Sequence, residues 1–209
     1  RISLSNNDSG NTSNTIFGKS AWNNSSNNGS DFNTIFGEGV MGTGTVAGAT
    51  YNTGVGYNVF QDVTLGHYNT ALGAASATNL TIGVNNVAIG QNAFFTATEA
   101  DECIAIGRDA LYALNHATSA DGTVAIGHTA LAALTSGARN TAVGYQASLA
   151  LTIGNDNTSL GYAALDELVD GNYNTAIGSY ALGDMQGSTV SDGSSSNTAV
   201  GYNAAGGNW

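Results

Sequence analysis

Six residues that begin at Gly37 match the spacing Gly-x-Gly-x-x-Gly, which dinucleotide-binding folds use to bring a phosphate close to the main chain. That chemistry requires a strand before the glycines and a long helix after them. Gly37 instead closes a short motif that recurs along the whole chain. We therefore interpret this glycine as a structural residue and expect no bound dinucleotide.

Acidic residues offer two further kinds of chemistry. Asp166, Glu167 and Asp170 could supply the two carboxylates of a glycoside hydrolase, although we expect them to line a solvated edge. The segment 154–157 is similar to a calcium-binding glycine-rich turn, but calcium rolls repeat their aspartate in every coil and this chain does not. We expect an ordinary turn there, and a fibre-borne polysaccharide hydrolase stays as an alternative.

The remaining nucleophiles and metal ligands do not form a constellation. His67, His116 and His128 fall at three different positions of the repeat, and Cys103 is the only cysteine. No Gly-x-Ser-x-Gly motif occurs. The sequence predicts no catalytic, cofactor-binding or metal residue, and therefore neither an enzyme nor a cofactor.

Two rows of residues could contact a ligand directly. Aligned tyrosine rings can stack on sugars, and four tyrosines directly follow a repeat glycine: Tyr57, Tyr145, Tyr162 and Tyr202. Regular threonine rows can order water, so an ice-binding solenoid is an alternative function. The threonines of the motif are Thr15, Thr34, Thr53, Thr70, Thr141, Thr158, Thr175 and Thr198.

These residues are positioned by a tandem repeat. The pattern Asn-Thr-small-apolar-Gly recurs eleven times, with a basic spacing of 17 residues and four short insertions. Insertions in solenoids form loops that often carry binding sites, here at 115–122 and 187–196. The motif glycines are Gly18, Gly37, Gly56, Gly73, Gly90, Gly107, Gly127, Gly144, Gly161, Gly178 and Gly201.

Each unit carries two apolar stretches separated by glycine corners. In the first, the residues on either side of a central Ala share a face, which predicts a short strand with that face in the core. The second, such as 110–114, spaces its apolar residues by three, which favours a helical turn, with a bent strand as the alternative. Such units must stack to bury their apolar faces.

The fold predicted is mainly β: a parallel β-solenoid or β-roll of about eleven 17-residue coils. Residues 1–13 would form a partial N-terminal coil and residues 14–209 the repeat solenoid, open at both ends. We expect the motif asparagines to form a hydrogen-bonded ladder from coil to coil, interrupted at Cys103 and Thr123. They are Asn14, Asn33, Asn52, Asn69, Asn86, Asn140, Asn157, Asn174 and Asn197.

The charge balance excludes several partners. The chain has 15 Asp plus Glu against 4 Lys plus Arg, a formal net charge of −11. Binding to nucleic acid needs clustered basic residues, so we expect no nucleic-acid partner. No apolar run reaches the length of a membrane-spanning helix, so we expect no membrane insertion.

The tandem motif resembles the repeats of phage tail-fibre proteins, most closely at 140–147 and 197–204. It is also similar to the head repeats of trimeric autotransporter adhesins at 86–90 and 123–127. The resemblance spans about residues 14–205, and Ile16 and Ile35, at the usual Ala position, depart from it. It implies a homotrimeric fibre outside the cell, on a virion tail or a bacterial surface, with a host glycan or protein as receptor.

The central alanines of the repeat give some independent support for a trimer. They are expected on the face opposite the core, where a stripe of small residues suits close approach of neighbouring chains or a flat exposed face. These residues are Ala71, Ala88, Ala105, Ala125, Ala142, Ala176 and Ala199.

Overall fold

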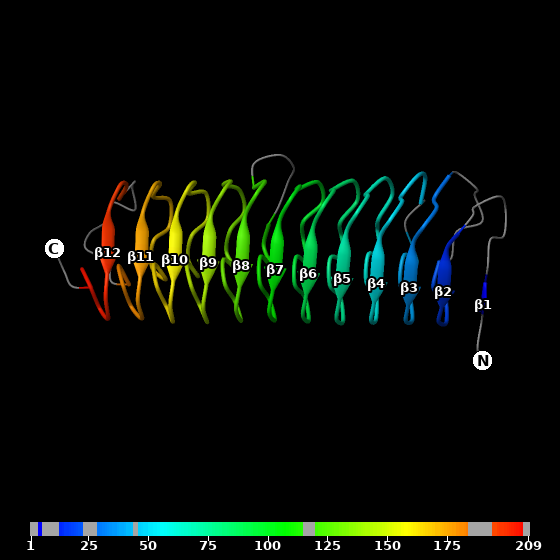
Figure 1. Ribbon diagram of the computed structural model, residues 1–209, viewed down its shortest axis with the longest axis horizontal. Helices are drawn as coiled ribbons and strands as arrows, with labels where there is room; N and C mark the ends of the chain where they lie inside the picture. The colour runs from blue at the N-terminus through cyan, green and yellow to red at the C-terminus, as the bar shows by residue number, and fades with distance from the viewer. Residues whose placement is uncertain are drawn as a thin grey trace.

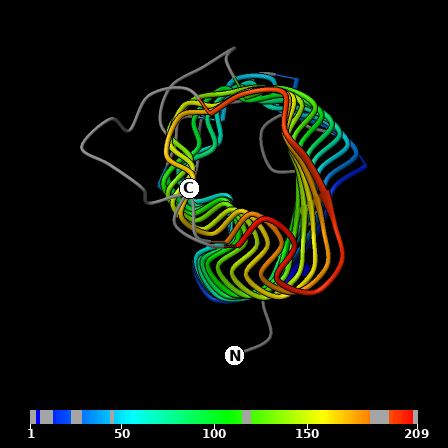
Figure 2. The ribbon, with the colours of Figure 1, turned by 90° about the vertical axis from the view of Figure 1, so that its left-hand side faces the viewer.

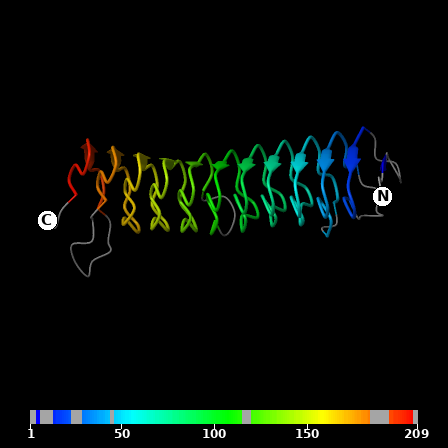
Figure 3. The ribbon, with the colours of Figure 1, turned by 90° about the horizontal axis from the view of Figure 1, so that it is seen from below.

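The computed structural model describes residues 4–5, 13–22, 29–43, 46–114, 120–183 and 194–206. It is a parallel β-solenoid, as the repeat predicted, and it has about 9 turns. The strands stack in chain order along the long axis of a rod (Figure 1). Viewed along that axis, successive coils superimpose closely (Figure 2). The strands lie along one long side of the rod (Figure 3).

Each motif copy contributes one strand of three residues. Consecutive strands from β2 to β12 pair in parallel and in register, so that Ala88 lies opposite Ala105. The count of about eleven coils and the boundary at residue 13 stay predictions. The strands are β1 (Leu4–Ser5), which pairs antiparallel with β2, then β2 (Thr15–Phe17), β3 (Thr34–Phe36), β4 (Thr53–Val55), β5 (Thr70–Leu72), β6 (Val87–Ile89), β7 (Ile104–Ile106), β8 (Val124–Ile126), β9 (Thr141–Val143), β10 (Thr158–Leu160), β11 (Thr175–Ile177) and β12 (Thr198–Val200).

The second apolar stretch of each unit contains no helix within the described ranges, so the predicted helical turn is wrong. Asn92 and Phe94 have φ of 53° and 59°, and Asp109 and Leu111 repeat this with 56° and 49°. A right-handed helix needs consecutive residues with negative φ. Here, residues with positive φ alternate with residues with negative φ, so the chain bends back and forth and does not form a helix.

Hydrogen bonds between coils continue outside the strands. The Phe94 N–H donates to the Ala110 carbonyl at 2.9 Å, and the Thr81 N–H donates to the Thr98 carbonyl at 2.9 Å. Bonds within one coil also occur, such as the Leu134 N–H to the Leu131 carbonyl at 3.1 Å. The segments that turn the chain between strands therefore satisfy their main-chain groups largely through the next coil, which explains how a helix-free segment can be buried.

The strands face the opposite way from the predicted orientation. Ala88 is buried, whereas its neighbours Val87 and Ile89 are partly exposed, and the same pattern holds in every strand from β2 to β12. A Cβ at Gly54, the equivalent residue of β4, would lie 3.1 Å from the Phe60 ring. The inner side of the strand meets large side chains at close range and leaves room for a small residue.

The core therefore combines the central strand residues with the apolar residues of the turn segment. In one coil these are Ala88, Ala93, Phe94 and Ala97, all buried. The departures at Ile16 and Ile35 also point inward and are 7% and 1% exposed.

The motif glycines allow the coils to approach closely at the end of each strand. Gly90 has a φ of 129°, and a Cβ there would lie 2.6 Å from the carbonyl oxygen of Gly107 in the next coil. Only a residue without a side chain fits both the backbone conformation and the contact.

Candidate ligand-contact surface

The motif asparagines form a buried ladder parallel to the axis of the rod. Asn33 donates its main-chain N–H to Oδ1 of Asn14 at 2.8 Å and its side-chain amide to the Ala49 carbonyl at 2.9 Å. The same contacts link Asn33, Asn52, Asn69 and Asn86, and then Asn140, Asn157, Asn174 and Asn197. Their polar atoms are used within the fold, so these residues are structural and do not reach a ligand.

Cys103 and Thr123 replace asparagine in the middle of the ladder but keep part of its bonding. The Cys103 N–H still donates to Oδ1 of Asn86 at 2.9 Å, and its thiol lies 3.2 Å from the Ala120 carbonyl. The hydroxyl of Thr123 lies 3.4 Å from the Gly137 carbonyl. Burial of Cys103 raises the pKa of its thiol from 9.0 to about 12, so it is a poor nucleophile and a poor metal ligand.

The structure brings two of the predicted receptor tyrosines into contact. Tyr145 and Tyr162 stack with ring centroids 5.5 Å apart and an interplanar angle of 7°. His128, which follows its motif glycine as the tyrosines do, stacks on Tyr145 at 5.1 Å. Because these rings cover one another's faces, they present mainly edges to a ligand. Tyr57 lies apart, separated from this row by coils with other residues at the same position.

Tyr202 is connected to the same row through Tyr180, which the sequence pattern did not identify. Tyr180 packs edge-on against Tyr162 at 5.1 Å and against Tyr202 at 6.5 Å. It stands one position later in its coil than the other tyrosines, so the search for tyrosine directly after glycine did not find it. A hydrogen bond with Tyr162 raises the pKa of Tyr180 above its ordinary value.

Other aromatic stacks lie at different positions of the coil. Phe32, Tyr51 and Tyr68 stack on successive coils at 4.8 and 4.9 Å, and Phe17 stacks on Phe36 at 4.6 Å. In-register coils place equivalent side chains one strand spacing apart, so any aromatic residue repeated in adjacent units forms such a stack. The sequence did not single these residues out, although their spacing carried the information.

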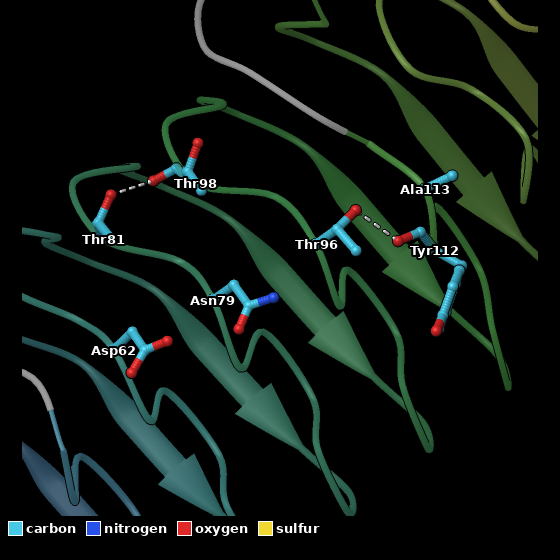
Figure 4. A pocket seen from close by; sticks show the side chains of 7 residues that line it. All are labelled: Asp62, Asn79, Thr81, Thr96, Thr98, Tyr112 and Ala113. Atoms are coloured by element: carbon cyan, nitrogen blue, oxygen red, sulfur yellow. Dashed lines mark hydrogen bonds between the residues drawn. The ribbon is translucent and has the colours of Figure 1, made fainter.

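A shallow groove of about 570 Å³ crosses four coils beside the turn segments. Asp62, Asn79, Thr96 and Ala113 occupy one position in successive coils and form its length, with Tyr112 at one end (Figure 4). Thr81 and Thr98 form a second row along it (Figure 4). The sequence analysis missed this groove because none of its residues belongs to the motif.

Two of the three Thr hydroxyls of the groove are held by hydrogen bonds to the next coil. Thr81 Oγ1 donates to the Thr98 carbonyl at 2.8 Å, and Thr96 Oγ1 lies 2.8 Å from the Tyr112 carbonyl. The Asn79 side chain makes no hydrogen bond to the part of the chain that the structure describes. Its amide is therefore available to a bound molecule.

The residues weighed for metal or acid chemistry belong to two segments of the chain, 154–157 and 166–170. Asp156, in the turn 154–157, is held by Arg139 at 2.7 and 2.9 Å, and this hydrogen bonding lowers the pKa of Asp156. Asp166 and Glu167 are consecutive, partly buried residues between β10 and β11. Within the described ranges, no group of three or more His, Cys, Asp or Glu could hold a metal ion, and no helix could cross a membrane.

Two earlier candidates fall partly or wholly outside the described residues. His116 lies there, as do residues 115–119 and 187–193 of the two insertions.

His67, another of the histidines, lies within the described residues. It contacts Thr50, with 2.9 Å between its Nδ1 and the Thr50 hydroxyl oxygen.

The fold and surface define the class of protein as a parallel β-solenoid repeat protein. Comparison with protein-family models, with curated proteins and with solved structures finds no match.

Proposed function

We propose that the chain is a structural segment of a homotrimeric fibre, of the phage tail-fibre or bacterial surface-adhesin type, that acts outside the cell and has no enzymatic activity. The observation that carries this proposal is the unbroken in-register pairing of β2 to β12. At about 4.8 Å per coil, eleven coils make a rod on the order of 50 Å long. A rod of this kind serves as a shaft.

The stiffness of the shaft follows from the bonding between coils. Each coil is joined to the next by strand pairing and by hydrogen bonds in the turn segments, and the asparagine ladder adds a third set of bonds everywhere except at Cys103 and Thr123. Bending the rod would strain all three sets together. In such arrays each unit is stabilised chiefly by its neighbours.

The outer face of the strands is the best candidate for the trimer seam, in place of the inward-facing alanines. It carries no charged residue on any strand from β2 to β12, although the chain has a net charge of −11. Copies of an acidic chain repel each other least along an uncharged face. The residues of this outer strand face are Thr15, Phe17, Thr34, Phe36, Thr53, Val55, Thr70, Leu72, Val87, Ile89, Ile104, Ile106, Val124, Ile126, Thr141, Val143, Thr158, Leu160, Thr175, Ile177, Thr198 and Val200.

The outer strand face is a long, narrow strip. It is about 50 Å long and about 10 Å wide, so it offers on the order of 500 Å² per chain. Three copies around a threefold axis would bury about 1,500 Å² in all, or about 500 Å² for each pair, which is less than a standard pairwise interface. A stable trimer therefore needs further contacts beside this strip.

Light scattering of the native chain tests this proposal. The fibre segment is expected at about 63 kDa, three times the chain mass of 21.0 kDa. A mass near 21 kDa would contradict the trimer.

Ice binding is a second candidate, because the threonines of the outer strand face point outward in one row. Thr34, Thr53 and Thr70 are exposed on adjacent strands. The row continues as Val87 and Ile104 in the middle of the rod, which are also partly exposed. Thermal hysteresis of the monomeric or trimeric chain decides this: growth inhibition of ice crystals supports the candidate, and its absence removes it.

A further inference from the structure

We propose that the groove between Asp62 and Tyr112 binds a short stretch of an extended, neutral polysaccharide that runs parallel to the axis of the rod. The inference rests on the proposed function, because it gives the fibre segment a means of attachment to a host-surface glycan. It concerns a surface different from the tyrosine row that the sequence singled out.

The shape of the groove fits a linear chain. Its residues come from four successive coils, with Asp62, Asn79, Thr96 and Ala113 in one line (Figure 4). Three coil spacings of about 4.8 Å give a length of about 14 Å. The groove is shallow and open along this line, so a stretch of an extended polymer can lie in it.

The polar groups of the groove suit hydroxyl-rich ligands. Asn79 offers an amide that can both donate and accept hydrogen bonds, and it has no partner within the described part of the chain. Asp62 accepts the Thr43 hydroxyl at 2.7 Å through Oδ1, and the described residues leave its Oδ2 without a donor. Sugar hydroxyls can donate to both residues and accept from the Asn79 amide.

Tyr112 supplies an apolar platform at one end. One face of its ring stacks on Phe95, with centroids 5.3 Å apart and an interplanar angle of 4°. In the next coil the equivalent residue is Ala132, so no aromatic ring continues the stack. Tyr112 as a whole is 38% exposed, and the apolar face of a pyranose can pack against its ring while the hydroxyls around the sugar edge reach water and Asn79.

The charge of the groove selects against acidic glycans. Among the described residues that line the groove, Asp62 is the one that carries a charge, and none is Lys or Arg. A uronate or sulfate would meet a carboxylate without a compensating cation, in a chain of net charge −11. A neutral β-1,4-linked hexopyranose chain avoids this electrostatic repulsion. Its extended shape also matches the linear groove.

Calorimetric titration of the full chain with cellohexaose, chitohexaose and a hyaluronan hexasaccharide tests the proposal. We expect saturable binding of at least one of the two neutral probes and none of hyaluronan. Tyr112→Ala should weaken the binding at least tenfold and Asn79→Ala severalfold. Tyr173→Ala is the matched control, because it removes a tyrosine that is 63% exposed and does not line the groove, and it should leave the affinity unchanged.

Three results would overturn the groove assignment: no saturable binding of either neutral probe, wild-type affinity in Tyr112→Ala, or tighter binding of hyaluronan. Unfolding midpoints of all variants show whether a loss of binding is a loss of the fold. The native mass is measured on the same samples, so a trimer without binding overturns the groove alone. A monomer that binds overturns the fibre alone.

Discussion

Asn157 donates both its main-chain N–H and its side-chain amide to Oδ1 of Asn140, at 3.0 and 3.1 Å. The same side-chain amide also donates to the Gly171 carbonyl at 2.8 Å. One buried side chain thus joins its own coil to the coils on both sides. This relationship is the unit from which the asparagine ladder is built.

Asn157→Ala is therefore expected to destabilise the fold by about 1–3 kcal/mol, because it leaves buried groups of three coils without partners. Chemical denaturation measures this loss. Ser179→Ala, at a partly exposed position between strands, is the control and should change the free energy of unfolding by less than about 0.5 kcal/mol. Equal stability of the two variants would show that the ladder contributes little.

Gly107→Ala should be more damaging than Gly122→Ala. Gly107 has a φ of 130°, and a Cβ there would lie 2.4 Å from the Gly127 carbonyl oxygen. Gly122 has a φ of 70° and its nearest neighbour would be 3.8 Å away. We expect about 3 kcal/mol or more for Gly107→Ala and about 1–2 kcal/mol for Gly122→Ala, from thermal unfolding midpoints. The reverse order would contradict the close stacking of the motif glycines.

The orientation of the strands predicts opposite responses at neighbouring residues. Ala142 is buried and Thr141 is partly exposed. Ala142→Leu should cost about 1–3 kcal/mol through overpacking, whereas Thr141→Leu should leave the stability nearly unchanged. Thermal unfolding measures both. A tolerant Ala142 together with a sensitive Thr141 would restore the orientation expected from the sequence.

The buried thiol predicts a loss of stability at high pH. Because the pKa of Cys103 rises from 9.0 to about 12 on folding, the unfolded chain loses the thiol proton first. The contribution is constant below about pH 9 and falls above it by up to about 1.4 kcal/mol per pH unit. The difference in stability between the native chain and Cys103→Ser, measured from pH 7 to 10.5, isolates this effect from the tyrosines. A difference that does not change with pH would contradict the burial of the thiol.

The sequence predicted the fold well because the repeat imposes one strand and one set of corners per unit. It placed the wrong residues of each strand in the core: the outer two were expected there, and the central one is buried. A three-residue strand with apolar residues on both faces contains no polar–apolar alternation that would identify the buried face. The decisive fact was the packing inside the coil: a Cβ at Gly54 would already be crowded by Phe60, and from β5 to β12 the equivalent residue is Ala or Ser. Ile16 and Ile35, in the first two repeats, are the larger inward-facing residues. The apolar residues of the second stretch are spaced by three, which is typical of a helix. In the structure this spacing accompanies an alternation of positive and negative φ along the segment.

The candidate sites were predictable only where they belonged to the motif. Tyr145 and Tyr162 stand at one repeat position, so their contact followed from the period. Tyr180 is displaced by one residue, and Asn79 and Tyr112 lie in the variable part of the unit. Residues of this kind become a surface only when the coils are stacked.

Cysteine cross-linking tests the trimer and its seam most directly. Ile126→Cys places a thiol on the outer strand face, and Ile153→Cys places one on another exposed part of the rod. The native Cys103 is buried and does not interfere. Under mild oxidation we expect a covalent dimer for Ile126→Cys and none for Ile153→Cys. A dimer only in Ile153→Cys, or in neither variant, would contradict a trimer that meets along the outer strand face.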